Sequence, residues 1–227
     1  MLAPRAVSYV LLVLVAVVHL LAQLVAPEGV LAEATQPLLM PALAAVLVVG
    51  TPAPRPALVR VTLVALFFSW LGDTLPRLVS SDTGFLLMIG CFLLAQLAYI
   101  CAFWGFRTGS VLGRPLLLAP YAVALVALVA TCRAGAGGLL PAVVVYGTAL
   151  AAMAVLATGL GRVAGIGGAV FMLSDALIAL RAFADVDLPA HSFWVMLTYV
   201  VGQGLLVVAV RSRAADADCR AGLVSVA

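Results

Sequence analysis

Long apolar runs alternate with short polar turns along the whole chain. A helix needs about 17–22 predominantly apolar residues to cross the roughly 30 Å of hydrocarbon in a bilayer. Eight runs approach or reach this length, and they lie near 7–26, 37–50, 58–75, 85–106, 115–131, 139–160, 164–183 and 192–210. The second run is short, which a tilted helix would accommodate. The pattern predicts an all-α, polytopic integral membrane helix bundle of about eight transmembrane helices.

The turns between these runs are too short to hold a soluble domain. Residues 1–210 are therefore expected to form a single eight-helix membrane domain, followed by a short, disordered cytoplasmic tail at 211–227. Composition agrees, because 66% of the residues are hydrophobic and only 9% are charged, far outside the range of soluble proteins. The first run is longer than the apolar core of a signal peptide and lacks a clean cleavage site, so we expect it to remain as a helix.

The basic residues are all arginine, and their distribution along the chain predicts an orientation. With eight spans both termini lie on one side, and nine arginines fall on that side: Arg5, Arg55, Arg60, Arg107, Arg114, Arg162, Arg211, Arg213 and Arg220. Three fall on the other side: Arg77, Arg133 and Arg181. The positive-inside rule then puts both termini in the cytoplasm of a multi-pass cell-membrane protein. The net charge of +3 is thus a topology signal, and no nucleic-acid partner is expected.

Two aspartates stand out against this apolar background. Asp73 comes at the outer end of the third run and Asp175 lies within the seventh. A carboxylate in hydrocarbon costs about 2.5–3.5 kcal/mol on insertion scales, so intramembrane acids usually have a function. The other polar residues in the runs are His19, Gln96, Tyr99, Tyr146, Ser174, Tyr199 and Gln203. Hydrocarbon offers them no hydrogen-bond partner, so we expect them to turn inward around a shared polar interior, with both aspartates on one cavity.

Each of these residues also has a purely structural explanation. The glutamines and tyrosines could join helices by hydrogen bonds, and His19 could be a packed histidine. Asp73 could be an interfacial residue that precedes the helix-ending Pro76. Asp175 is deeper, and no arginine lies three or four residues away on its own helix. Gly165 and Gly168 are expected to allow a close helix contact at the start of the seventh run.

Several motifs that would indicate other chemistry do not occur in the sequence. It has no GxSxG elbow, no HExxH, no P-loop and no His/Cys cluster with metal-ligand spacing, so no cofactor or metal is expected. The four cysteines show no CxxC pairing and are interpreted as small apolar fillers.

The polar residues resemble the pattern of the YhhN family, whose animal members are lysoplasmalogenases. The resemblance covers essentially the whole chain, and it is carried by Gly72-Asp73, the aromatic-rich run from Phe85 to Phe103, the run from Gly168 to Asp175 with Phe183, and Thr198 to Gln203. Two positions depart from the pattern. Family members often have lysine where this chain has Gln36, and histidine where it has Gln96.

The resemblance implies hydrolysis of the vinyl-ether bond of a lysoplasmalogen, or of a related lysolipid, to a fatty aldehyde and a glycerophospho-alcohol. Such chemistry requires one protonated carboxyl group to protonate the vinyl ether and one carboxylate to stabilise the resulting cation. Asp175, the deeper group, is interpreted as the acid and Asp73 as the carboxylate, with the reverse assignment open. The expected substrate-binding residues are Gln96, Tyr99, Tyr146, Ser174, Tyr199 and Gln203.

Two other classes of function use the same residues. A proton-coupled transporter of small molecules or lipids could use the two aspartates as a proton relay. A structural membrane protein could use them only to join helices. A hydrolase differs from both because it makes aldehyde in detergent without any gradient. The expected partners of the hydrolase are a lysophospholipid-type substrate and the membrane lipids.

Overall fold

The computed structural model describes residues 3–224, and within them the chain forms helices and no strand. The α-helices are α1 (Pro4–Val25), α2 (Val30–Gly50), α3 (Ala57–Thr74), α4 (Ser81–Phe103), α5 (Pro115–Ala136), α6 (Leu140–Ala157), α7 (Arg162–Ala184) and α8 (His191–Val224). Short 3-10 segments are η1 (Leu75–Leu78), η2 (Trp104–Gly109), η3 (Val111–Gly113), η4 (Gly137–Leu139) and η5 (Thr158–Leu160). A polytopic all-α bundle is thus confirmed.

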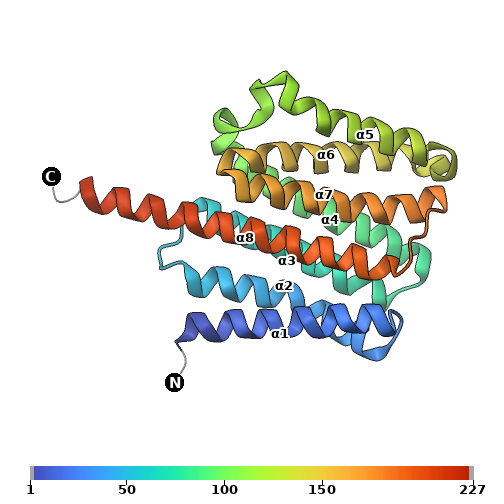
Figure 1. The fold of residues 1–227 in the computed structure, drawn as a ribbon, viewed down its shortest axis with the longest axis horizontal. Helices are drawn as coiled ribbons and strands as arrows, with labels where there is room; N and C mark the ends of the chain where they lie inside the picture. Colours follow the sequence, from blue (N-terminus) through green and yellow to red (C-terminus); the bar gives the residue numbers. More distant parts are fainter. Residues whose placement is uncertain (1–2, 225–227) are drawn as a thin grey trace.

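Seven helical stretches of the described residues are long and apolar enough to cross a membrane. One of them, Pro115–Leu160, has 46 residues and contains both α5 and α6. A straight helix of that length would measure about 69 Å, more than twice the thickness of the hydrocarbon. The stretch instead turns at η4, where Gly137 has a φ of 48°, and α6 runs back beside α5 (Figure 1).

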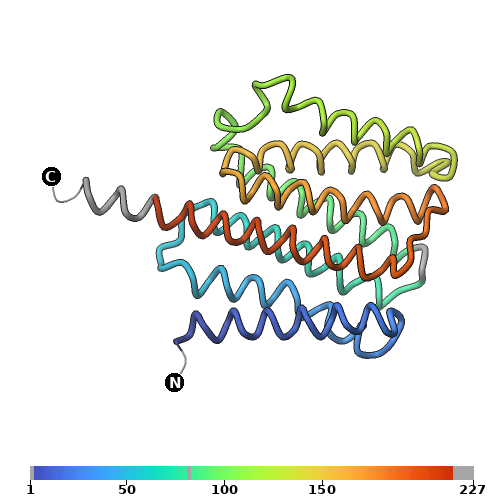
Figure 2. The backbone as a smooth tube through the Cα atoms, in the orientation of Figure 1, coloured from blue at the N-terminus to red at the C-terminus, as the bar shows by residue number. Residues whose placement is uncertain are grey.

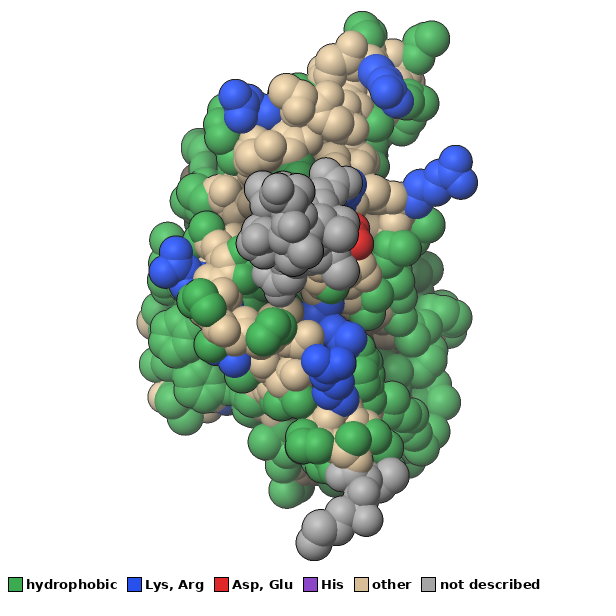
Figure 3. Space-filling view, turned by 90° about the vertical axis from the view of Figure 1, so that its left-hand side faces the viewer, with side chains coloured by type: hydrophobic (Ala, Val, Ile, Leu, Met, Phe, Trp, Pro, Cys, Tyr) green, Lys and Arg blue, Asp and Glu red, His purple; other side chains and the backbone are tan. Residues whose placement is uncertain are grey.

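Successive helices run in opposite directions, so both chain ends lie at the same end of the bundle (Figures 1 and 2). We call this the terminal end. Arginine side chains are spread over it, with little acidic surface among them (Figure 3). The opposite end, called the distal end, carries Arg77 after α3, Arg133 near the end of α5 and Arg181 near the end of α7. This arrangement agrees with the arginine distribution from which the orientation was predicted.

Two boundaries differ from those expected from the sequence. Helix α2 begins at Val30 instead of near residue 37, and it includes Pro37 and Pro41. Glu33 therefore lies in the first turn of α2 and not in a loop, and Gln36 lies on a helix. Helix α8 continues to Val224, so residues 211–224 are helical where the sequence predicts a disordered tail. Residues 225–227 of that tail lie outside the described residues.

Helix α7 packs closely against two neighbours through glycines. A Cβ on Gly168 would lie 2.9 Å from the Cα of Ala154 in α6, and one on Gly165 would lie 3.1 Å from the Thr158 side chain. A Cβ on Gly167 would lie 3.0 Å from the Gly202 carbonyl in α8. The predicted close contact at Gly165 and Gly168 is confirmed. The contact of Gly167 with Gly202 packs α7 equally closely against α8.

Candidate functional site

Asp73 lies in the last turn of α3 and is only 4% exposed. Its Oδ1 accepts a hydrogen bond from Gln36 Nε2 on α2 at 3.0 Å, and its Oδ2 accepts one from the Tyr199 hydroxyl on α8 at 2.8 Å. Arg77 of η1 donates through Nε to the backbone carbonyl of Asp73 at 3.0 Å and through Nη2 to Gln36 Oε1. Gln36 therefore bridges the carboxylate and a guanidinium, and three helices fix the position of this carboxylate.

The packing around Tyr199 holds its hydroxyl against Asp73. The Tyr199 ring makes edge-to-face contacts with Phe92 at 5.7 Å and with Phe171 at 5.6 Å between ring centroids. Phe92 can approach because residue 72 is glycine, where a Cβ would lie 2.9 Å from the Phe92 ring. In the Gly72-Asp73 pair, the glycine thus allows α4 to pack closely against α3, and the next residue is the buried aspartate.

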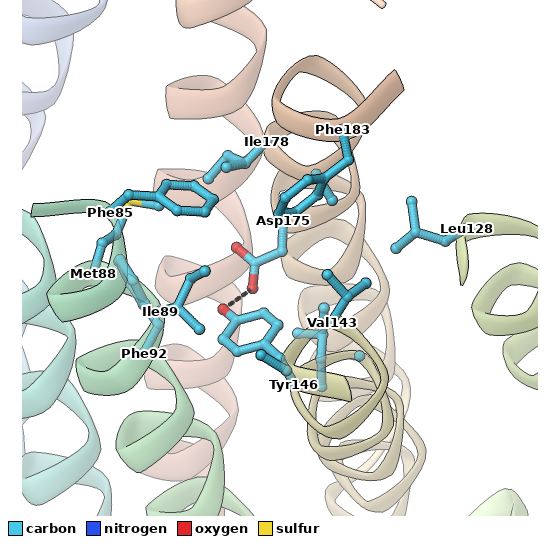
Figure 4. Close-up of a pocket in the computed structure, with 14 residues that line it drawn as sticks. Phe85, Met88, Ile89, Phe92, Leu128, Val143, Tyr146, Asp175, Ile178 and Phe183 are labelled. Carbon is cyan, nitrogen blue, oxygen red and sulfur yellow. Dashed lines mark hydrogen bonds between the residues drawn. The ribbon is translucent and has the colours of Figure 1, made fainter. Parts of the chain in front are cut away.

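Asp175 lies within α7 and is 7% exposed. Its Oδ2 accepts a hydrogen bond from the Tyr146 hydroxyl of α6 at 2.6 Å, while its Oδ1 has no hydrogen-bond partner among the described residues (Figure 4). The surrounding side chains are apolar, and they include Phe85, Met88 and Ile178. They line a narrow cleft of about 60 Å³, which we call the apolar cleft.

Asp73 faces a larger cavity of about 500 Å³ toward the distal end, which we call the polar cavity. Gln36, Arg77 and Tyr199 line it together with Ser174, Arg181 and His191. The polar cavity and the apolar cleft share four wall residues, Phe85, Met88, Phe92 and Ile178. The two aspartates thus lie on adjoining cavities. The sequence predicted both aspartates on one cavity; in the structure each lines its own cavity, and the two cavities meet at side chains of α4 and α7.

Charged side chains of both signs lie where the polar cavity reaches the distal end. The Asp187 carboxylate lies 3.7 Å from Arg181 Nε and 3.5 Å from His191 Nδ1. The Arg181 side chain is 53% exposed, so its guanidinium remains accessible from solvent and from the cavity. Together with Arg77, it gives the cavity two guanidinium groups.

The other predicted site residues divide into two sets. Tyr146, Ser174 and Tyr199 line the cavities, and the Ser174 hydroxyl donates to the Val195 carbonyl at 2.9 Å. Tyr99 and Gln203 do not line either cavity. The Tyr99 hydroxyl donates to Gln203 Oε1, and Gln203 Nε2 donates to Ser69 Oγ at 3.1 Å, so this buried chain of bonds joins α4, α8 and α3.

Gln96 and His19 line neither the polar cavity nor the apolar cleft. Gln96 is fully buried, and neither atom of its amide has a hydrogen-bond partner among the described residues. His19 is also fully buried and shares hydrogen bonds with Thr35 at 2.9 Å and with Gln23 at 3.3 Å. Gln23 in turn lines the polar cavity, so His19 supports a wall residue from behind.

Six polar residues that line the polar cavity were not predicted as site residues from the sequence: Gln23, Gln36, Arg77, Arg181, His191 and Ser192. Arg77 follows Asp73 by four residues, one helical turn, which is a signal that the sequence does contain. Gln36 was missed because the start of α2 was placed after it. Arg181 and His191 come together only through the packing of α7 on α8. Among the described residues, no group of three His, Cys, Asp or Glu side chains is placed to hold a metal ion.

The chain belongs to the YhhN family, because the sequence model of that family matches residues 31–210. The match runs from the start of α2 into α8 and leaves out α1 and the end of α8. It includes both aspartates and the side chains that donate hydrogen bonds to them. No curated protein and no solved structure matches the chain.

Proposed function

With membership of the YhhN family as the premise, we propose that this multi-pass protein of the cell membrane hydrolyses the vinyl-ether bond of lysoplasmalogens or of a related lysolipid. The products are a fatty aldehyde and a glycerophospho-alcohol. The observation that carries the proposal is the pair of adjoining cavities, each with one buried aspartate. One aspartate has an apolar environment and the other is surrounded by hydrogen-bond donors.

The surroundings of the two carboxyl groups support a division of labour. An apolar environment with a single hydrogen bond favours a neutral carboxylic acid, which is what Asp175 requires to act as a proton donor. Gln36 and Tyr199 both donate to Asp73, and such bonds favour a carboxylate. Asp175 is accordingly the acid and Asp73 the base in the proposed mechanism.

The reaction begins when Asp175 transfers its proton to the β-carbon of the vinyl ether, which leaves an oxocarbenium ion at the α-carbon. The Asp73 carboxylate stabilises this cation and accepts a proton from the water that attacks it. The hemiacetal that forms then collapses: its hydroxyl gives up its proton as the C=O bond of the aldehyde forms, the C–O bond to glycerol breaks, and the glycerol oxygen takes up a proton and leaves as an alcohol. The sum is the addition of one water molecule, after which the proton returns from Asp73 to Asp175 through solvent.

The side chains that line the two cavities suit an amphiphile. Arg77 and Arg181 give the polar cavity guanidinium groups that suit a phosphate ester. The apolar cleft suits the hydrocarbon next to the vinyl-ether bond. The proposed place of the reacting bond is where the two cavities meet, between Asp73 and Asp175.

The test is turnover by the purified protein in detergent, with a lysoplasmalogen and an ordinary 1-acyl lysophospholipid offered separately. We expect aldehyde from the lysoplasmalogen and no fatty acid from the acyl lipid. Asp175→Asn and Asp73→Asn should each lower the rate by about a hundredfold or more. The double variant should be scarcely slower than either single one, because the two act as a unit.

Asp185→Asn is the matched control. Asp185 is exposed and follows α7 with a φ of 53°, a conformation that asparagine also tolerates. It lines neither cavity, so this variant should keep full turnover. A rate above about a tenth of wild type in Asp175→Asn would remove Asp175 from the chemistry. Gradient-dependent uptake into vesicles without any aldehyde would instead establish the transporter.

A further inference from the structure

A third cavity lies at the terminal end of the bundle, away from the candidate site. Its volume is about 410 Å³, and it lies between the first turns of α1, the end of α2 and the C-terminal half of α8. Arg5, Tyr9, Thr51, Arg211 and Ser212 are its polar wall residues. It has no wall residue in common with the polar cavity or the apolar cleft. We call it the terminal cavity.

Arg211 is held in place in this cavity. Its guanidinium carbon lies 5.2 Å from the centre of the Tyr9 ring, a cation–π contact between α8 and α1. The side chain also lies across Gly50, where a Cβ would come within 2.5 Å of Arg211 Nε. Stacking occupies the face of the guanidinium and leaves its N–H groups available at the edge. The glycine at the end of α2 therefore provides the space in which this cation is oriented.

The two arginines have no counter-ion among the described side chains. Both ion pairs among the described residues lie at the distal end, around Asp187. Within the described residues, neither the Arg5 nor the Arg211 side chain of the terminal cavity donates a hydrogen bond. The neighbouring hydroxyls are already used. Thr51 donates to the Leu47 carbonyl at 2.7 Å and Ser212 to the Val208 carbonyl at 3.1 Å. The cavity thus offers mainly unpaired guanidinium donors, and Arg is the side chain best matched to phosphate.

The wall of the terminal cavity continues into the lipid-facing surface. Val208 lines the cavity and is 42% exposed, and Val10 and Val13 on the outer face of α1 are about half exposed. A ligand that uses both surfaces has a phosphate group and alkyl chains. The arginine distribution orients this end toward the cytoplasm, and basic pockets between helices on that side suit anionic lipid head groups. We propose that the terminal cavity binds the phosphate of an anionic phospholipid from the cytoplasmic leaflet, with Arg5 and Arg211 as its ligands.

The experiment follows the thermal unfolding midpoint of the purified full-length protein in an uncharged detergent. Phosphatidylglycerol, phosphatidylcholine and inorganic phosphate are titrated separately. We expect phosphatidylglycerol to raise the midpoint and the other two to leave it nearly unchanged. In the double variant Arg5→Gln/Arg211→Gln, about tenfold or more phosphatidylglycerol should be needed for the same shift. An equal shift with inorganic phosphate would overturn the proposal, because the ligand would then be a small anion.

Two further variants separate a built site from general attraction to charge. Arg114→Gln/Arg162→Gln removes the same charge from the same end, but neither residue lines the cavity, so the lipid response should remain. Gly50→Ala keeps both charges and displaces the Arg211 side chain, so the response should weaken. An equal loss in the control pair, or a full response in Gly50→Ala, would overturn the proposal. Turnover of lysolipid is not used, so the result is independent of the proposed hydrolase.

Discussion

The Tyr199 hydroxyl gives the sharpest test of how the site holds Asp73. Tyr199→Phe removes the bond of 2.8 Å to Asp73 Oδ2 and leaves the ring that packs between Phe92 and Phe171. The change therefore isolates one hydrogen bond without creating a void. Gln36 still donates to the other carboxylate oxygen, so Asp73 keeps one of its two side-chain donors.

The expected loss of rate follows from the charge of the carboxylate that accepts this hydrogen bond. A hydrogen bond to a charged group contributes about 1.5–3 kcal/mol, which corresponds to about 10- to 150-fold in rate if it acts in the transition state. Asp73 lines the polar cavity, where water can replace the lost hydroxyl. We therefore expect the lower end of the range, a fall of about tenfold in kcat, measured as aldehyde released from a lysoplasmalogen in detergent.

Tyr99→Phe is the matched control. Tyr99 is also a buried tyrosine whose hydroxyl donates to a side chain, but its partner is Gln203 and it lines neither cavity. Loss of this bond leaves a buried amide oxygen without its donor, so the stability should fall by about 1–3 kcal/mol while kcat stays near that of wild type. Full kcat in Tyr199→Phe, or an equal loss of kcat in both variants, would refute the reasoning.

Three further predictions concern packing, orientation and substrate recognition. Gly168→Leu should destabilise the bundle by about 1–3 kcal/mol or more in thermal unfolding. Gly204→Leu should cost less, because a Cβ at residue 204 would meet no atom within 4 Å. Equal unfolding midpoints for the two variants would contradict the α6–α7 contact. Reporters fused to the C-terminus and to the turn between α3 and α4 should report opposite compartments, and a shared compartment would exclude the eight-span arrangement. Arg181→Gln should raise the KM for a phosphate-bearing lysolipid about tenfold and leave the KM for an alkenylglycerol, which lacks the phosphate, unchanged. An equal rise in KM for both substrates would exclude phosphate recognition by Arg181.

The fold was largely predictable because a bilayer restricts what a chain can do. Apolar runs of sufficient length must become helices, and the short turns between them force antiparallel neighbours. The break between α5 and α6 was also visible, since the glycines at 137 and 138 interrupt an apolar stretch. The start of α2 was not predicted, because Glu33 and the prolines at 37 and 41 resemble a loop when hydropathy alone is considered.

The site was predictable only in part, because composition identifies polar residues but not their partners. Asp73 and Asp175 stood out from the apolar background, and the tyrosines at 146 and 199, which the sequence also singled out, line the cavities. Which aspartate each tyrosine bonds depends on how α6 and α8 rotate against α3 and α7, and that rotation is set by packing at the glycines. Tyr99 looks the same as Tyr199 in the sequence, yet it joins helices away from both cavities.

The apolar wall shared by the two cavities has a consequence for the fate of the products. A bond cut at this wall leaves its hydrocarbon part on the apolar side and its polar part on the wet side. The polar cavity lies toward the distal end, which the positive-inside rule predicts to face away from the cytoplasm. The proposed enzyme would therefore release its two products to different places. The aldehyde would return to the bilayer, and the head group would leave into the water at the distal end. Separated in this way, the two fragments could not easily recombine.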